Sequence, residues 1–202
     1  MPLSQSWSKS ATIATDKTPY ENDGVIYGAT YTADRYGQAN KAMSFDGVDD
    51  YIDCGTPIIP AGDFSISAWC YKEGVISEYN SICGQYTTAK EGRMWFGFQK
   101  SAFGYRIGGE SKTVSVKYNE HLHCVITREG TTVKVYLNGN LVITGTAVDS
   151  IYQGANTIIG SYDSTAGRFN GSINDVRIYN RALSEEEIKL LYESYNPNIN
   201  IG

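Results

Sequence analysis

Short apolar segments separated by polar, turn-forming residues dominate the pattern of the chain. The clearest segment is 64–70, where Phe64, Ile66, Ala68 and Cys70 occupy every second position. Alternation with a period of two predicts a β-strand with one face against a core. Segments of similar character, each bounded by Gly, Asn, Asp or Ser, predict further strands at 42–45, 51–54, 81–85, 93–99, 104–107, 113–116, 123–127, 157–160 and 169–179.

One hairpin is specified by its turn. Two strand-like runs within 132–143 flank Asn138-Gly139, a dipeptide that readily adopts the two positive φ angles of a type I′ turn. A second turn at 128–130 joins this hairpin to the strand before it. The sequence therefore predicts a three-stranded antiparallel meander across 123–143.

A single helix is predicted near the C-terminus. Ser184 and Glu187 have the spacing of a capping box, and three consecutive glutamates favour the positive end of a helix. One apolar face follows, made of Ile188, Leu191, Tyr192 and Tyr195. Many short strands and one terminal helix predict an all-β fold, a two-sheet antiparallel β-sandwich with one short C-terminal helix.

The 202 residues contain no fixed repeat and no low-complexity linker, which favours one domain. Residues 1–15 are polar and weakly patterned, and we expect an N-terminal arm or an edge strand there. The sandwich is expected to span 16–195, followed by a C-terminal tail at 196–202.

Charge and hydropathy exclude several classes of partner. Charged residues make up 19% of the chain and the net charge is -5, so no basic field attracts phosphates. Nucleic acid and anionic membranes are therefore not expected partners. No apolar run is long enough for membrane insertion, and residues 1–9 lack the features of a secretory signal peptide.

The four cysteines, Cys54, Cys70, Cys83 and Cys124, match neither metal-ligand spacing nor a C-x-x-C redox motif. Cys70 lies on the apolar face of its predicted strand, and Cys124 lies inside an apolar run. We expect reduced, buried thiols in preference to a disulfide framework.

Two stretches carry a family resemblance. Residues 43–52, followed by 64–69, resemble the opening of laminin G-like, concanavalin A-like lectin/glucanase jelly-roll domains of bacteria and phages. Residues 169–184 resemble the close of these domains, and 123–127 with 133–139 their central strands and Asn-Gly turn. The resemblance covers 16–195 and implies a jelly roll. The chain departs from the family pattern at 13–24, which is more polar than the usual first strand and Gly-rich loop.

The same resemblance implies one structural calcium ion near the ends of the domain. Asp175 is the expected ligand from the closing strand, with Asp46 and Gly47 contributing and Asp16 or Asn22 replacing the missing loop ligand. Calcium prefers such oxygen ligands. Without the family, Asp46-Gly47 is simply a turn and Asp175 a solvated strand residue.

Catalysis has little support in the sequence. The Glu-x-Asp-x-x-Glu strand of related glycosidases is absent, and the acidic residues at 46–53 alternate in and around a turn. His121 and His123 would share one strand face and could supply two ligands of a metal site, although a hydrogen-bonded pair is the simpler interpretation. No phosphate-binding loop or serine elbow is present, so the chain is not expected to be an enzyme.

Glycan binding requires aromatic rings beside planar polar groups. Aromatic residues near strand or loop ends are the natural candidates, although most aromatic residues of a sandwich lie in its core. Alternation places Phe96 and Phe98 on one face and Trp95 on the other. The candidate residues are Trp95, Tyr105, Tyr86, Tyr79, Tyr162, Arg93 and Gln99.

Two functions remain open. The first is a non-catalytic, adhesin-like module that binds a cell-surface glycan or a protein, and the second is a structural virion protein that decorates a particle or its tail. A glycoside hydrolase accessory domain is a weaker third alternative. Reduced thiols without an export signal favour a phage particle, whose proteins fold in the host cytosol, and we expect a virion-surface or extracellular location. Residues 2–10 are the expected docking arm, and self-association is left open.

Overall fold

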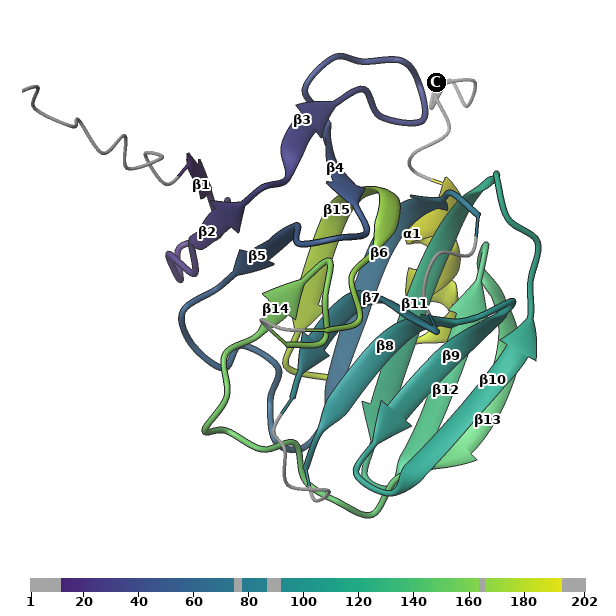
Figure 1. Cartoon of the computed structure of the whole chain (residues 1–202). Coiled ribbons are helices and arrows are strands. Elements are labelled where there is room, and N and C mark those ends of the chain that lie inside the picture. The colour runs from purple at the N-terminus through teal and green to yellow at the C-terminus, as the bar shows by residue number, and fades with distance from the viewer. Residues whose placement is uncertain (1–11, 75–77, 87–91, 164–165, 194–202) are drawn as a thin grey trace, which may run out of the picture.

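The computed structural model describes residues 12–74, 78–86, 92–163 and 166–193, and it folds as two stacked antiparallel β-sheets (Figure 1). Sheet A contains, in spatial order, β1 (Thr12–Ala14), β2 (Gly24–Tyr27), β5 (Tyr51–Asp53), β14 (Ile158–Ile159), β7 (Tyr79–Gln85), β8 (Met94–Gln99), β9 (Ala102–Ile107) and β10 (Glu110–Ser115). Sheet B contains β13 (Asn140–Thr146), β12 (Thr132–Leu137), β11 (His121–Glu129), β6 (Phe64–Lys72), β15 (Asn170–Tyr179), β4 (Ala42–Asp46) and β3 (Thr30–Thr32). The predicted antiparallel sandwich is confirmed.

The core lies between the two sheets. Cross-strand partners point to the same side of a sheet, so the row Cys83, Phe96 and Tyr105 in sheet A faces inward together. The alternating strand predicted at 64–70 is β6, and its Phe64 and Ile66 are fully buried in the same core. Burial of such large apolar side chains contributes about 1.5–3 kcal/mol each.

The predicted hairpin is formed by β12 and β13. Asn138 has a φ of 51° and Gly139 a φ of 77°, as a type I′ turn requires. The Asn138 side-chain oxygen also accepts a hydrogen bond from the His123 amide at 2.9 Å, which ties the turn to β11.

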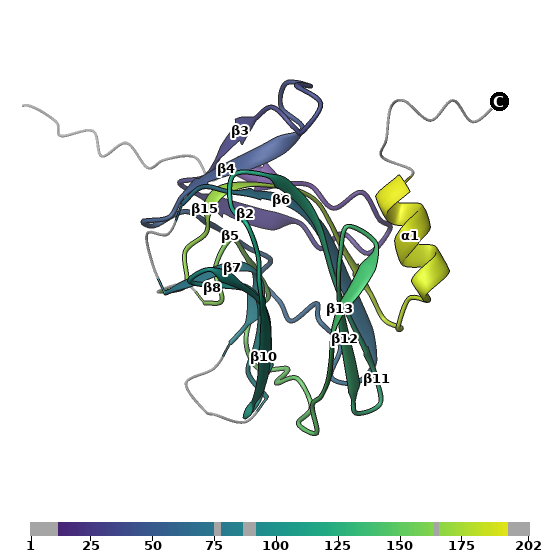
Figure 2. The ribbon, with the colours of Figure 1, turned by 90° about the vertical axis from the view of Figure 1, so that its right-hand side faces the viewer.

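The predicted helix is α1 (Glu185–Glu193), which packs on the outer face of sheet B (Figure 2). Ser184 Oγ accepts the Glu187 amide at 3.2 Å, and Glu187 Oε2 accepts the Ser184 amide at 2.9 Å, so the capping box is complete. Arg181 and the Ser184 amide lower the pKa of Glu187 to about 2. Ile188 is buried against Val125, while Tyr195 lies outside the described residues.

The N-terminal strands β1, β2 and β3 were predicted only in part. Residues 12–14 form an edge strand, one of the two structures expected for the N-terminal segment, and residues 1–11 lie outside the described part. β2 and β3 were not predicted, because each is short and exposes a tyrosine. Within the described residues, no helix combines the length and apolarity needed to cross a membrane.

All four cysteines are free and buried. Burial raises the pKa of Cys54 to about 12 and also raises the pKa values of Cys83 and Cys124. Cys70 Sγ lies 3.6 Å from Cys124 Sγ, well beyond the S–S bond length of about 2.05 Å. The structure thus agrees with the expectation of reduced core thiols.

This burial predicts slow thiol chemistry. In the native chain at pH 8, none of the four thiols is expected to react with a disulfide reagent on the timescale of minutes, because reaction requires an accessible thiolate. After denaturation all four should react at once. Rapid reaction of a native thiol, or fewer than four thiols after denaturation without reductant, would contradict this result.

Candidate functional site

The outer face of sheet A, turned away from the core, carries most of the predicted aromatic residues. Tyr79 pairs with Gln99, and Gly84 pairs with Trp95, which in turn pairs with Arg106. Since neighbouring Phe96 faces the core, this second set of side chains projects outward. The prediction that Trp95 points away from Phe96 is confirmed.

Four rings on this face are in mutual contact. The centroid of the Tyr79 ring lies 5.5 Å from that of Trp95 and 6.1 Å from that of Tyr162, both edge to face. Tyr86 lies on the other side of Tyr162, at 4.8 Å. Residues separated by more than eighty positions in sequence therefore form one cluster.

Planar polar side chains form hydrogen bonds with the tyrosine hydroxyls at the edges of this cluster. Arg93 Nη1 donates to the Tyr86 hydroxyl at 3.3 Å, and Gln99 Nε2 donates to the Tyr79 hydroxyl at 3.3 Å. Arg93 is itself fixed by donation from Nε to the Gly108 carbonyl at 3.2 Å. Tyrosine, arginine and glutamine thus present fixed hydrogen-bonding groups beside ring surfaces.

The loop after β14 places Tyr162. Its ends are tied to β7, with the Gly160 amide donating to the Ile82 carbonyl at 3.0 Å and the Ser81 amide donating to the Gly167 carbonyl at 2.9 Å. Gly84 allows the close approach, because a Cβ there would lie 2.3 Å from the Tyr162 Cα. The loop therefore rests directly on the strand.

Sequence reasoning missed a neighbouring group on the same face. Tyr27 and Tyr51 stack with centroids 4.6 Å apart and planes 12° apart, and the Arg168 guanidinium lies 4.5 Å from the Tyr51 centroid. Tyr27 is 44% exposed. Alternation around Ile52 could have placed Tyr51 on the outer face, but nothing in the sequence shows that Tyr27 pairs with it.

Arg168 and Tyr162 belong to the same loop, so the two groups adjoin. We call their combined surface the aromatic face. Burial raises the pKa of Tyr51 and Tyr162, so both hydroxyls stay protonated at neutral pH. The aromatic face comprises Tyr27, Tyr51, Tyr79, Tyr86, Trp95 and Tyr162, with Arg93, Gln99 and Arg168.

Two predicted residues take different positions. Tyr105 is fully buried and points into the core, where its hydroxyl donates to the Thr146 carbonyl at 3.3 Å. Its inclusion as a glycan-binding residue is corrected, because its ring cannot meet a ligand. Trp95 is only 4% exposed, so it forms the floor under Tyr79 instead of an open plate.

The residues expected to share one calcium ion do not meet. Asp46 pairs with Asn170 on β15, whereas Asp175 lies five residues further along, at a β-bulge between Asn174 and Arg177, and the two do not share a cluster of potential metal ligands among the described residues. Asp175 Oδ1 instead accepts from Arg177 Nε at 3.0 Å. Asp16 accepts the Asn22 amide in a separate turn before β2. The structure therefore does not bring Asp175, Asp46 and Asp16 together as one set of ligands.

The acidic turn after β4 remains as a smaller cation candidate. Carboxylate oxygens of Asp46, Asp49 and Asp50 lie within 4.8 Å of one another. Asp46 Oδ1 accepts the Val48 amide at 2.8 Å, and Asp50 Oδ2 accepts the Asp46 amide at 2.9 Å. The turn interpretation of Asp46-Gly47 is thus confirmed, and the donor set is the hard oxygen type that calcium prefers.

The two histidines differ in environment. His123 is 2% exposed, packs on the Trp69 ring with centroids 5.1 Å apart, and its Nε2 lies 2.9 Å from Ser67 Oγ. His121 is exposed beside Tyr71. In the described part of the chain, neither histidine joins a cluster of three potential metal ligands. A packing role therefore accounts for His123.

The two stacked antiparallel sheets define a class of fold, the lectin/glucanase-like jelly-roll β-sandwich. A family model described as the concanavalin A-like lectin/glucanases superfamily (Laminin_G_3) matches residues 46–189. The chain belongs to this family, as its opening and closing segments indicate. No match was found among curated proteins.

Solved structures share the fold at low sequence identity. Domain 4 of AbnA, a GH43 extracellular arabinanase from Geobacillus stearothermophilus in complex with arabinotriose, is 18% identical with a TM-score of 0.65, covering 90% of this chain and 87% of that one. The botulinum neurotoxin serotype D binding domain is 15% identical with a TM-score of 0.64, covering 90% and 49%. The botulinum neurotoxin serotype D ligand binding domain in complex with N-acetylneuraminic acid is 16% identical with a TM-score of 0.64. The match covers 90% of this chain and 48% of that one. The chain thus spans about half of the neurotoxin domains.

Proposed function

We propose that this domain is a non-catalytic glycan-recognition module and that the aromatic face of sheet A is its binding surface. The observation that carries the proposal is the contact network of Tyr79, Trp95, Tyr162 and Tyr86, with Arg93 and Gln99 bonded to its hydroxyls. A sugar has apolar C–H faces and a rim of hydroxyls. Rings with planar donors beside them match both features.

The geometry of this face suits an extended ligand. The stacked Tyr27–Tyr51 pair and the Tyr79 cluster lie on opposite sides of the loop that carries Tyr162 and Arg168. An oligosaccharide is long enough to contact both groups, whereas a single sugar is not. We therefore expect affinity to rise with chain length.

Carboxylates near the aromatic face have structural partners. Asp163 Oδ1 accepts the Ala166 amide at 2.8 Å, Glu78 accepts from Gln99 Nε2 at 3.4 Å, and Asp53 Oδ1 accepts from Asn156 Nδ2 at 2.9 Å. Glycoside hydrolysis needs an acid and a second carboxylate set across the scissile bond. Domains of this family are often non-catalytic binding modules, although glycoside hydrolases also contain them, and engagement of these carboxylates favours binding.

The structural neighbours support the chemistry without fixing the ligand. Domain 4 of AbnA, which this chain covers to 87%, was solved in complex with arabinotriose. The neurotoxin domain solved with N-acetylneuraminic acid is matched over only 48% of its length, so it does not show which part of that domain holds the sugar. The aromatic face of this chain has its own residues, and its specificity is a separate question.

A glycan array tests the proposal. The purified chain should bind a related set of oligosaccharides, with trimers or longer chains above monosaccharides. A blank array for a folded domain would contradict glycan recognition. It would favour the alternative, a structural part of a virion that decorates a particle or its tail.

We also propose a calcium ion at the acidic turn, held by Asp46, Asp49 and Asp50. Asp49 is the informative position, because its carboxylate is exposed, whereas Asp46 and Asp50 accept backbone amides of the turn. At a hundredfold excess over its Kd, calcium would add about 2.7 kcal/mol to the free energy of unfolding.

Thermal unfolding checks this site. Chelator should lower the Tm of the wild type, and Asp49→Asn should remove most of the difference between calcium and chelator. The charge-matched control Glu120→Gln, an exposed residue, should keep it. Equal Tm values for the wild type in calcium and in chelator would contradict the calcium site.

We further propose display on a virion or cell surface, where a glycan receptor is accessible. The test is immunogold labelling of particles and cells that produce the protein. Label confined to the cell interior would contradict display, independently of the array result.

A further inference from the structure

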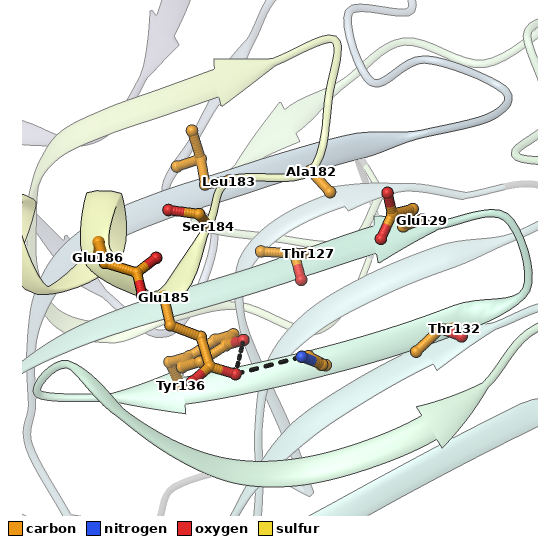
Figure 3. A pocket seen from close by; sticks show the side chains of 10 residues that line it. Thr127, Glu129, Thr132, Tyr136, Ala182, Leu183, Ser184, Glu185 and Glu186 are labelled. Atoms are coloured by element: carbon orange, nitrogen blue, oxygen red, sulfur yellow. Dashed lines mark hydrogen bonds and ion pairs between the residues drawn. The ribbon is translucent and has the colours of Figure 1, made fainter.

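A concave site lies on the sheet opposite the aromatic face, where the start of α1 crosses β11 and β12 (Figure 3). Its volume is about 320 Å³, equivalent to about ten water molecules and enough for one sugar ring with its substituents. The aromatic face lies on sheet A, so the two surfaces are on opposite sides of the sandwich. The pocket is lined by Thr127, Glu129, Thr132, Lys134, Tyr136 and residues 182–186.

The lining carries an excess of negative charge. Glu185 Oε1 is neutralised by Lys134 Nζ at 3.2 Å and accepts from the Tyr136 hydroxyl at 3.3 Å. The interaction also raises the pKa of Lys134. Among the described residues, Glu129 and Glu186 have no cation within 4.0 Å. The Glu186 carboxylate instead accepts hydrogen bonds from its own amide and from the Ser184 side chain, which lower its pKa. Glu129 is therefore the carboxylate of the pocket that stays available to a cationic ligand.

Thr127 adds a buried polar group to the floor. This residue is only 4% exposed, projects from the outer face of β11, and lies with Ala182 and Tyr136 around the hollow (Figure 3). Its hydroxyl forms no hydrogen bond to any residue that the structure describes. The hydroxyl oxygen is not among the fully buried side-chain atoms that lack a partner, so it opens toward the hollow, where a ligand can bond to it.

A backbone amide at the start of α1 supplies a hydrogen-bond donor on the helix side of the pocket. The capping box occupies the amides of Ser184 and Glu187, and the Glu186 amide donates to its own carboxylate. The Glu185 amide lies in the first turn of α1, where no intrahelical acceptor exists. Hydroxyls, carboxylates and an amide thus converge, a mixture that matches a ligand whose own hydroxyls both donate and accept.

We propose that this pocket binds a monosaccharide unit bearing a free amino group. The hydroxyls of the sugar bond to Thr127, Thr132 and the Glu185 amide, and its ammonium group lies against Glu129. The excess of carboxylates disfavours acidic sugars, and the mixed lining disfavours apolar ligands. The inference does not depend on glycan binding at the aromatic face.

Titration of the full chain at pH 6.5, followed by amide NMR, tests the proposal. Glucosamine should shift the amides of Thr127, Lys134 and Ala182, whereas glucose should bind more weakly and glucuronate should not shift them. Ethanolamine supplies the amine without the ring. If ethanolamine binds as tightly as glucosamine, the sugar part of the proposal is overturned.

Substitutions locate the site. Glu129→Gln should weaken glucosamine binding about tenfold, since it removes one charge-assisted hydrogen bond. Thr127→Val, which keeps the side-chain shape, should weaken both glucosamine and glucose by several-fold. Glu110→Gln and Thr113→Val, exposed on β10 of the other sheet, are matched controls. Unchanged binding in both test variants, or shifts confined to the aromatic face, would overturn the proposal and leave the proposed function intact.

Discussion

Acidification from pH 7 to pH 5 is expected to remove about 2 kcal/mol from the free energy of unfolding through His123 alone. Burial, with the charges of Arg35 and Arg177, lowers the pKa of His123 to about 4, from 6.5 in an exposed chain. Between these values the unfolded chain binds a proton that the folded chain excludes. Stability is therefore full above about pH 6.5, falls as pH falls, and reaches a total loss of about 3 kcal/mol below pH 4.

Urea unfolding at pH 7 and pH 5 measures this loss, above the range where most carboxylates titrate. Burial and Arg35 lower the pKa of His121 too, but His121 is exposed, so His121→Gln should keep most of the dependence. His123→Gln should remove most of it. If His123→Gln fails to fold, the ring-proton shift of His123 in the wild type decides the question. A midpoint near pH 6.5 for that proton would contradict the account.

Tyr162→Ala is expected to weaken binding of an oligosaccharide selected on the array about thirtyfold, equivalent to about 2 kcal/mol. Tyr162 contacts both Tyr79 and Tyr86, and it lies in the loop that also carries Arg168. Its loss removes one ring surface and the support of two others. Isothermal titration calorimetry provides the measurement.

Tyr20→Ala is the matched control, because Tyr20 is 77% exposed and lies outside the aromatic face. It should bind as the wild type does, and both variants should retain a cooperative thermal transition. Equal affinities of the two variants would place the binding surface elsewhere on the domain.

Most of the fold could be predicted from local sequence. The β6 alternation, the Asn138-Gly139 turn and the Ser184–Glu187 capping box each specify their own geometry within a few residues, and each appears as expected. β2 and β3 were not predicted, because short strands with exposed tyrosines acquire their pairing from β5 and β4 and not from their own pattern.

Part of the aromatic face could also be predicted from local sequence patterns. Alternation separated Trp95 from Phe96, and turn-adjacent tyrosines such as Tyr79 and Tyr162 were reasonable candidates. Tyr105 was misplaced because the register of the β8–β9 hairpin, which sets it beside Phe96 on the core side, was not predicted. The calcium set failed likewise, since the distance between Asp46 and Asp175 depends on how β4 and β15 are offset.

The most direct test of the central claim is an amide NMR titration of the chain with the best oligosaccharide from the array. We predict that the largest shifts map to β7, β8 and the loop from Gly160 to Phe169, with Tyr79, Gln99 and Tyr162 among them. Shifts concentrated on sheet B, or no saturable shifts with any oligosaccharide, would contradict the assignment of the aromatic face as a glycan-binding surface.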